Sequence, residues 1–299
     1  MKKSKLLFLG VILIILNVGA STLDESCESS YRNIDMQNIN VSLDENEELI
    51  CEAKNDEEKE VYKKGKKVLE KAIKENEELK KYIKETVRKG ERIEGISYTE
   101  CYFQEEENLE EVNSKEKDAI DEGKSIYQGK KAKERKLTLI SSLITKSEIV
   151  GTEAYALSSV AIWNSKDIEK RDIKDCISLC WPNTYKYNGV NVIKGYYDNR
   201  KEVNFNNEDK RDDSGIVWSF KRTLKDKENT YNPDNITAAV QIIPKGEKGE
   251  TKIFSSEYIF DTEKLNIKLK KSSSKRYGGV KIIKGKTLKI SSPIKIVVK

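Results

Sequence analysis

The sequence contains no histidine. Without an imidazole, the chain cannot build a Ser-His-Asp triad, a Cys-His nucleophile pair or a histidine-containing metal site. Its acidic residues lie mostly in charged runs, so no pair stands out as the acid and base of a glycoside hydrolase. Glu257, in the stretch IFSSEYIF, is the nearest candidate, and strand alternation predicts that it lies on the outer face or at an edge. The composition favours a protein without enzymatic activity, metal or cofactor.

Long hydrophobic runs are also scarce, and one of them stands at the N-terminus. Lys2, Lys3 and Lys5 precede an apolar stretch that ends near Val18, and small residues follow up to Ala20. This pattern is typical of a secretory signal peptide cleaved after Ala20. An uncleaved anchor is the alternative, although the stretch is shorter than the roughly 20 residues of a membrane span. We therefore expect a secreted or extracytoplasmic protein, in a periplasm or at a cell surface.

Cysteine is rare, and its number is odd. The disulfide candidates are Cys27, Cys51, Cys101, Cys176 and Cys180. In an exported chain, cysteines are more often disulfide partners than metal ligands. We expect at most two disulfide bonds and one remaining thiol, and the sequence leaves the pairing open.

Acidic residues are missing from the end of the chain. Between Lys264 and Lys299 the sequence has twelve basic residues and no acidic one. The charge is split over the whole protein, with a net −8 over residues 21–150 and a net +10 over residues 151–299. Such asymmetry predicts either a half that binds polyanions or two halves that neutralise each other.

The first half of the chain has a helical pattern. Apolar residues recur at helical spacing from Asp56 to Lys89, and a second charged helix is expected over residues 105–136. The apolar stretch 137–163 predicts a core helix pair broken at Gly151. A membrane-inserting hairpin, as in a toxin, is the alternative for this stretch.

After Cys180 the pattern alternates with a period of two, which predicts antiparallel strands. Asn188-Gly189 predicts a tight hairpin turn with Tyr187 opposite Val190. Further strands are expected over 215–224, 236–243, 252–260 and the C-terminal run. We therefore expect an α+β fold: signal peptide 1–20, extended polar segment 21–53, mainly helical region 54–175, and antiparallel β domain 176–299.

The C-terminal run predicts up to four strands with one buried face and one lysine-rich face. A loop over 284–286 would place Ile282 opposite Leu288 and Val280 opposite Ile290. The lysines expected on the outer face are Lys264, Lys268, Lys270, Lys281, Lys289, Lys295 and Lys299. Lysine on a solvated strand can simply prevent unwanted strand pairing. However, solubility alone would also tolerate acidic residues on that face.

The leading hypothesis is an exported, non-enzymatic binding protein whose basic β face engages an anionic glycan, an envelope polymer or an anionic membrane surface. No motif for sequence-specific nucleic-acid recognition is present. Two alternatives remain: a membrane-perturbing protein that uses residues 137–163, and a carboxylate-dependent glycoside hydrolase.

Overall fold

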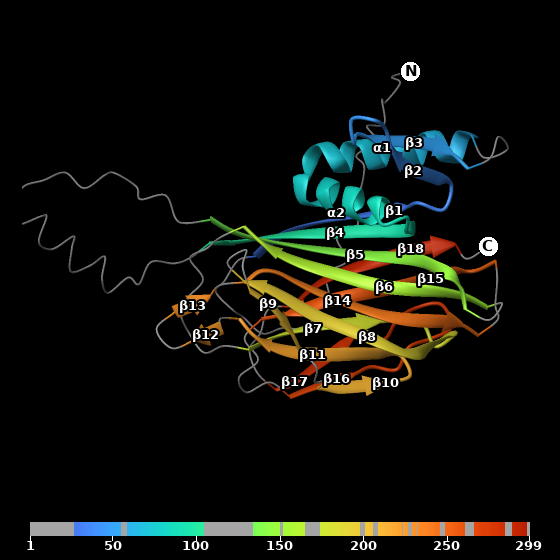
Figure 1. Ribbon diagram of the computed structural model, residues 1–299. Helices are drawn as coiled ribbons and strands as arrows, with labels where there is room; N and C mark the ends of the chain where they lie inside the picture. The colour runs from blue at the N-terminus through green and yellow to red at the C-terminus, as the bar shows by residue number, and fades with distance from the viewer. Residues whose placement is uncertain are drawn as a thin grey trace, which may run out of the picture.

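The computed structural model is a stack of four layers: helices with a hairpin, two β-sheets, and a second hairpin (Figure 1). The structure describes residues 27–54, 59–104, 134–149, 152–164, 174–197, 201–205, 209–222, 224–226, 229–231, 233–245, 249–260, 266–284 and 289–297. The predicted signal peptide and almost all of the helix predicted over 105–136 lie outside these ranges.

Two antiparallel sheets form the body of the protein. In spatial order, the larger consists of β1 (Cys27–Asp35), β4 (Arg92–Gln104), β5 (Glu134–Ile149), β6 (Thr152–Trp163), β14 (Pro233–Pro244), β8 (Tyr185–Tyr197) and β9 (Lys201–Asn204). The smaller consists of β10 (Lys210–Asp212), β11 (Gly215–Lys221), β7 (Lys174–Cys180), β15 (Thr251–Ile259) and β18 (Lys289–Val297). Strands distant in sequence are neighbours in both sheets.

Shorter elements complete the structure. The helical layer contains α1 (Lys59–Glu75), α2 (Glu77–Arg88), β2 (Ile39–Leu43) and β3 (Leu49–Ala53). The opposite outer layer is the hairpin β16 (Asn266–Leu269) and β17 (Val280–Lys284), and a small ribbon pairs β12 (Leu224–Asp226) with β13 (Asn229–Tyr231). The fold is therefore mostly antiparallel β with two short helices, so the antiparallel β part of the expected α+β fold is present.

The main core lies between the two sheets. It buries large aromatic side chains, among them Trp181, Trp218 and Tyr258. Trp163, Tyr258 and Phe260 form mutual edge-on or tilted contacts, with ring centroids 4.7 to 6.0 Å apart. Aromatic side chains bury the most apolar area per residue, so this core dominates the hydrophobic stabilisation of the sandwich.

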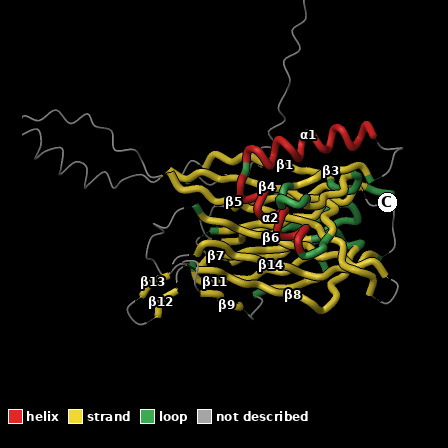
Figure 2. Tube along the Cα trace, turned by 45° about the horizontal axis from the view of Figure 1, so that its top comes forward, coloured by secondary structure: helices red, strands yellow, loops and turns green. Residues whose placement is uncertain are grey.

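The helical layer packs its apolar stripe on the seven-stranded sheet (Figure 2). Leu69 and Ala72 of α1 and Leu79 and Ile83 of α2 are fully buried. Asn76 separates the helices and caps α2, because its side chain accepts a hydrogen bond from the Leu79 backbone N–H at 2.8 Å. The helix predicted from residue 56 to residue 89 is confirmed as two helices with one buried face.

The helix pair predicted over 137–163 is wrong, because this stretch forms β5 and β6, paired with each other at the centre of the seven-stranded sheet. Leu139 and Leu157 face the main core, whereas Ile140 packs under the helices. A strand buried on both faces has no polar alternation, so its apolar residues can also match a helical period. In the described part of region 54–175, the helices end at Arg88.

The hairpin predicted at Asn188-Gly189 is also wrong, because β8 runs straight through it. β14 pairs with β8 on both sides of the dipeptide, with Val240 opposite Asn191 and Ile242 opposite Tyr187. The extra residues of β8 form a bulge, and Gly189 accommodates it with a φ of +77°. A long neighbouring strand thus converts a turn signal into a bulge.

The C-terminal strands pair differently from the prediction. Ile282 of β17 lies opposite Ile267 of β16, whereas β18 pairs with β15 in the five-stranded sheet. The predicted loop over 284–286 therefore does not join two paired strands. The wrong pairing arose because alternation shows which residues share a face but not which strand lies beside them.

Side chains of the larger sheet cap the edge of β18. Tyr31 Oη donates to Pro293 O at 2.6 Å, Asn33 bonds both backbone groups of Lys295, and Thr99 Oγ1 donates to Ser291 O at 2.8 Å. A free strand edge invites pairing with other chains. These bonds close that edge and join the two sheets.

Gly95 of β4 generates a stability prediction. A Cβ at this position would lie 2.5 Å from Ile296 Cγ2 and 2.8 Å from Ile294 Cγ2 of β18. We expect Gly95→Ala to lower the free energy of unfolding by about 1 to 3 kcal/mol, because overpacking forces these strands apart. Urea unfolding measures the change. Lys67→Ala, at an exposed position of α1, should stay within about 0.5 kcal/mol of wild type. Equal stability of both variants would contradict the packing at β4 and β18.

Candidate anion-binding surface

The outer hairpin presents a pair of adjacent lysines. Lys268 and Lys281 lie directly opposite each other in the β16–β17 ladder, and both are exposed. Their neighbours Ile267, Leu269 and Val280 point to the other side and pack on the five-stranded sheet. Like charges opposite each other in a ladder repel, since their Cβ atoms are only about 5 Å apart.

Lys270 follows β16 and is exposed as well. Within the described ranges, no carboxylate forms an ion pair with Lys268, Lys270 or Lys281. We call these three residues the hairpin lysines. All three side chains are exposed to solvent, so their charge is available to an anionic partner.

The positive surface continues onto β10. Lys210 Nζ donates a hydrogen bond to Ile267 O of β16, and Ser214 Oγ donates to Lys270 O at 3.4 Å. Arg211, the next residue of β10, belongs to a cavity that Lys186 and Lys245 also line. Sequence spacing could not reveal that Lys186, Arg211 and Lys245 lie together, because they come from three distant segments of the chain.

Lys289 is a structural residue, contrary to the prediction that it shares the outer face. Its ammonium lies 3.1 Å from Glu257 Oε1 and donates to Val280 O at 3.2 Å. Glu257 Oε2 in turn accepts a hydrogen bond from the Val280 N–H at 2.7 Å. The ion pair thus fixes both backbone groups of Val280 and attaches the outer hairpin to the sheet.

Glu257 faces away from the main core, as alternation predicts, but the outer hairpin covers it, so it is only 2% exposed and not at an edge. It lies on central strand β15, between β7 and β18. Gly279 permits this approach, because a Cβ there would lie 2.8 Å from Glu257 Oε1, and its φ is +75°. The charge of Lys289 compensates the burial of this carboxylate.

The remaining predicted lysines do not extend the hairpin surface. Lys295 is exposed on β18, at the edge of the five-stranded sheet opposite β10. Lys264 and Lys299 lie outside the described residues. The structure therefore brings together Lys268, Lys270 and Lys281 and separates them from Lys289 and Lys295.

Three of the disulfide candidates are free thiols: Cys51, Cys176 and Cys180. Cys176 and Cys180 face the same way on one strand, so their Cα atoms lie about 13 Å apart, whereas a disulfide needs less than about 7 Å. Cys101 is buried in β4 and disulfide-bonded, and the backbone of Cys27 belongs to β1, the strand paired with β4. Burial raises the pKa of the Cys51 and Cys180 thiols, which lowers their reactivity.

Asp175 and Glu257, which are buried among the described residues together with Glu94, do not form a catalytic pair. Asp175 is fully buried and accepts two hydrogen bonds from Arg222, at 2.6 and 2.8 Å, and one from Tyr258 Oη at 2.6 Å. Asp175 lies on the main-core side of the sheet, whereas Glu257 lies opposite Ser178 under the outer hairpin. A glycosidase needs both carboxyl groups on one cleft, so these two cannot act together.

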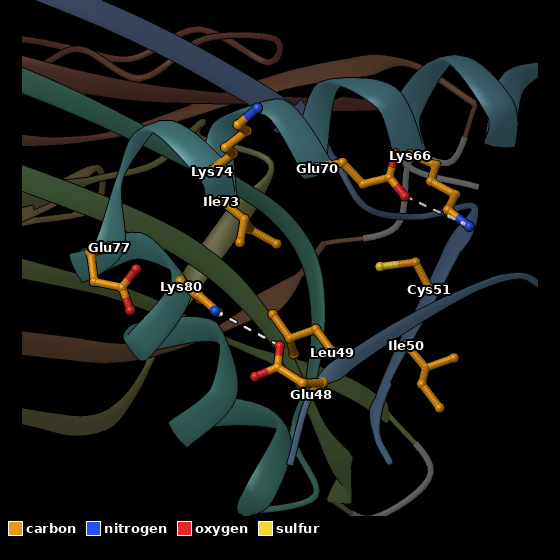
Figure 3. Close-up of a pocket in the computed structure, with 10 residues that line it drawn as sticks. All are labelled: Glu48, Leu49, Ile50, Cys51, Lys66, Glu70, Ile73, Lys74, Glu77 and Lys80. Atoms are coloured by element: carbon orange, nitrogen blue, oxygen red, sulfur yellow. Dashed lines mark ion pairs between the residues drawn. The ribbon is translucent and has the colours of Figure 1, made fainter. Parts of the chain in front are cut away.

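A cavity of about 690 Å³ forms a groove between β3 and the two helices. Leu49, Cys51 and Ile73 point into it (Figure 3). One ion pair at its rim lies along α1, from Lys66 to Glu70 at 3.8 Å, and another crosses it, from Lys80 to Glu48 at 3.7 Å. Lys84, with Lys80, holds the pKa of Glu48 below its usual value. The groove carries balanced charge and does not resemble the hairpin surface.

Two further observations concern the other hypotheses. None of the described helices is long and apolar enough to span a bilayer. The described ranges also contain no group of three or more Cys, Asp or Glu side chains placed to hold a metal ion.

No protein-family model matches the chain, and no curated protein resembles it. The function must therefore be argued from the surface itself.

The contrast between two lysines can be tested by unfolding. We expect Lys289→Gln to lower the free energy of unfolding by about 2 to 3 kcal/mol, because it leaves Glu257 buried without a counter-charge. Lys295→Gln removes the same charge from an exposed site of the same strand and should change stability by less than about 0.5 kcal/mol. Similar losses in the two variants would show that Glu257 and Lys289 do not form the described pair.

Thiol counting tests the cysteine assignment. The native protein should expose one thiol, Cys51, to alkylation. Because the pKa of this thiol is raised, the reaction should be slow at neutral pH and accelerate as the pH rises. Unfolding without a reductant should release Cys176 and Cys180 as well, and reduction should then give all five thiols. Mass spectrometry reads each stage. A single free thiol after unfolding without reductant would restore the two-disulfide prediction.

Proposed function

We propose that the protein is an exported, non-enzymatic binding protein of the cell surface or envelope that engages an anionic polymer through the hairpin lysines. The supporting observation is the exposed cross-strand pair of Lys268 and Lys281, which has no acidic partner among the described residues. Holding two like charges side by side costs free energy. An anionic ligand would neutralise the repulsion between the two lysines, so the surface favours the binding of an anion.

The kind of charge indicates the kind of ligand. Lysine ammonium groups act as point charges and do not impose the planar, two-pronged geometry of arginine. Lys268 and Lys270 are separated by about 7 Å along the strand, and Lys268 and Lys281 by about 5 Å across it. Such a row suits repeating charges on a glycan or envelope polymer better than a single phosphate group.

The two alternatives receive less support. A membrane-perturbing protein would have to withdraw β5 and β6 from the centre of the larger sheet, where Leu139 and Leu157 belong to the main core. A glycoside hydrolase would need two carboxylates in one cleft, whereas Asp175 and Glu257 lie on opposite faces of the sheet and each has a cationic partner. Binding through the hairpin lysines requires neither the withdrawal of β5 and β6 nor two carboxylates in one cleft.

Salt-dependent retention on immobilised heparin tests the proposal. The chain without its predicted signal peptide should elute well above physiological ionic strength, about 0.15 M. The variant Lys268→Gln, Lys270→Gln, Lys281→Gln should elute at clearly lower salt, because it loses the unpaired charges of the hairpin.

A matched control removes three other exposed charges. Lys64, Lys67 and Lys81 lie on the helices, are exposed and have no ion pair among the described residues. Changing these three to Gln lowers the net charge equally and should leave retention close to wild type. Equal weakening of both variants would mean that only net charge matters, and the hairpin proposal would then be discarded.

A further inference from the structure

A second cavity, of about 390 Å³, lies where the two sheets meet. It is lined by β8 and the end of β14 from the larger sheet, and by β10 with the turn that follows it from the smaller sheet. The lining residues are Lys186, Tyr187, Arg211, Asp212, Asp213 and Lys245. Its volume falls within the range of small-ligand sites in proteins.

Three cations converge on this cavity from distant parts of the sequence. Lys186, Arg211 and Lys245 are all exposed. Neither Lys186 nor Lys245 has an ion-pair partner in the part of the chain that the structure describes. The cavity therefore attracts an acidic group of a ligand.

The position of Arg211 is constrained. Its Cζ atom lies 5.0 Å from the centre of the Tyr187 ring, which places the guanidinium over an aromatic face. Tyr187 Oη in turn accepts a hydrogen bond from Asn191 Nδ2 at 2.7 Å. A guanidinium held in this way loses little further conformational freedom when a carboxylate or sulfate binds beside it.

The carboxylates restrict the ligand further. Asp212 Oδ1 is occupied, since it accepts bonds from Ser214 N and Ser214 Oγ, each at 2.8 Å. The Asp213 side chain is exposed and has no partner among the described residues, although its backbone oxygen accepts a bond from Trp181 Nε1 at 2.9 Å. A free carboxylate repels a ligand that is only anionic, but it accepts hydrogen bonds from hydroxyl groups.

We propose that this cavity binds one unit of an acidic polysaccharide, a sugar that carries carboxylate or sulfate groups beside free hydroxyls. The inference rests on the proposed binding function and names the chemical class of the polymer. Strand β10 borders both sites, because Lys210 reaches β16 whereas the adjacent Arg211 points toward Tyr187. The hairpin lysines hold the polymer, and the cavity recognises its sugar unit.

A short probe separates the two sites. A sulfated heparin disaccharide that contains a uronate is too short to depend on the hairpin. Its affinity is measured by calorimetry for three proteins without the predicted signal peptide. These are wild type, the hairpin-lysine variant, and a cavity variant with Lys186→Gln, Arg211→Gln and Lys245→Gln, so both variants lose three positive charges.

We expect the disaccharide to bind wild type and the hairpin-lysine variant alike, and to bind the cavity variant at least about ten-fold more weakly. This result would support the cavity even if wild type were not retained on the heparin column, in which case only the hairpin proposal fails. No binding to wild type, or equal binding to the cavity variant, would overturn the cavity proposal whatever the column shows. Urea unfolding of each variant confirms that the fold is retained.

Asp213→Asn distinguishes a sugar site from a simple basic patch. The substitution removes a negative charge, so polyphosphate, which has no hydroxyl groups along its chain, should bind more tightly. The disaccharide should bind more weakly, by about three- to ten-fold, because a charge-assisted hydrogen bond is lost. Tighter binding of both probes would overturn the assignment to a sugar and leave a site for anions in general.

Discussion

The structure depends on how β18, the edge strand of the smaller sheet, packs against the larger sheet. Ile294 and Ile296 of this strand pack where Gly95 of β4 lacks a side chain, and hydrogen bonds from Tyr31 and Asn33 of β1 close its edge. With β18 paired to β15, the basic C-terminal residues are distributed over two layers. This placement decides that Lys289 is half-buried against Glu257 while the residues of the outer hairpin remain in solvent.

Local sequence patterns predicted where helices and strands lie better than which strands pair with each other. The two helices follow from apolar residues that recur on a charged background, and β11 and β15 follow from alternation. Asn188-Gly189 suits either a turn or a bulge, and only the presence of β14 alongside selects the bulge. Lys289 and Lys295 stand in similar alternating surroundings, yet only Lys289 meets Glu257, which lies 32 residues away. Arg211 could not be assigned to a site, because its neighbours come from other segments.

The charges of the protein serve two purposes that the sequence alone cannot separate. Buried or half-buried cations such as Lys252 and Arg222 satisfy carboxylates or backbone oxygens and hold loops to the sandwich. Exposed cations without an ion pair among the described residues also lie on the helices, but Lys268 of β16 and Lys281 of β17 stand directly opposite each other. The net charge of a segment is therefore a weak guide to function, whereas the grouping of exposed cations from different strands at one place is a stronger one.

The bonds between β1 and β18 also affect when the protein can fold. Asn33 and Lys295 are 262 residues apart, so the first and last described strands must meet before the sandwich closes. Contacts of such long sequence separation slow folding, because the chain entropy is lost before the contact forms. The two sheets therefore cannot be completed on a partly synthesised chain. For a chain that crosses a membrane unfolded, as the proposed export requires, this delay is useful, because the compact state forms only after the last strand has emerged.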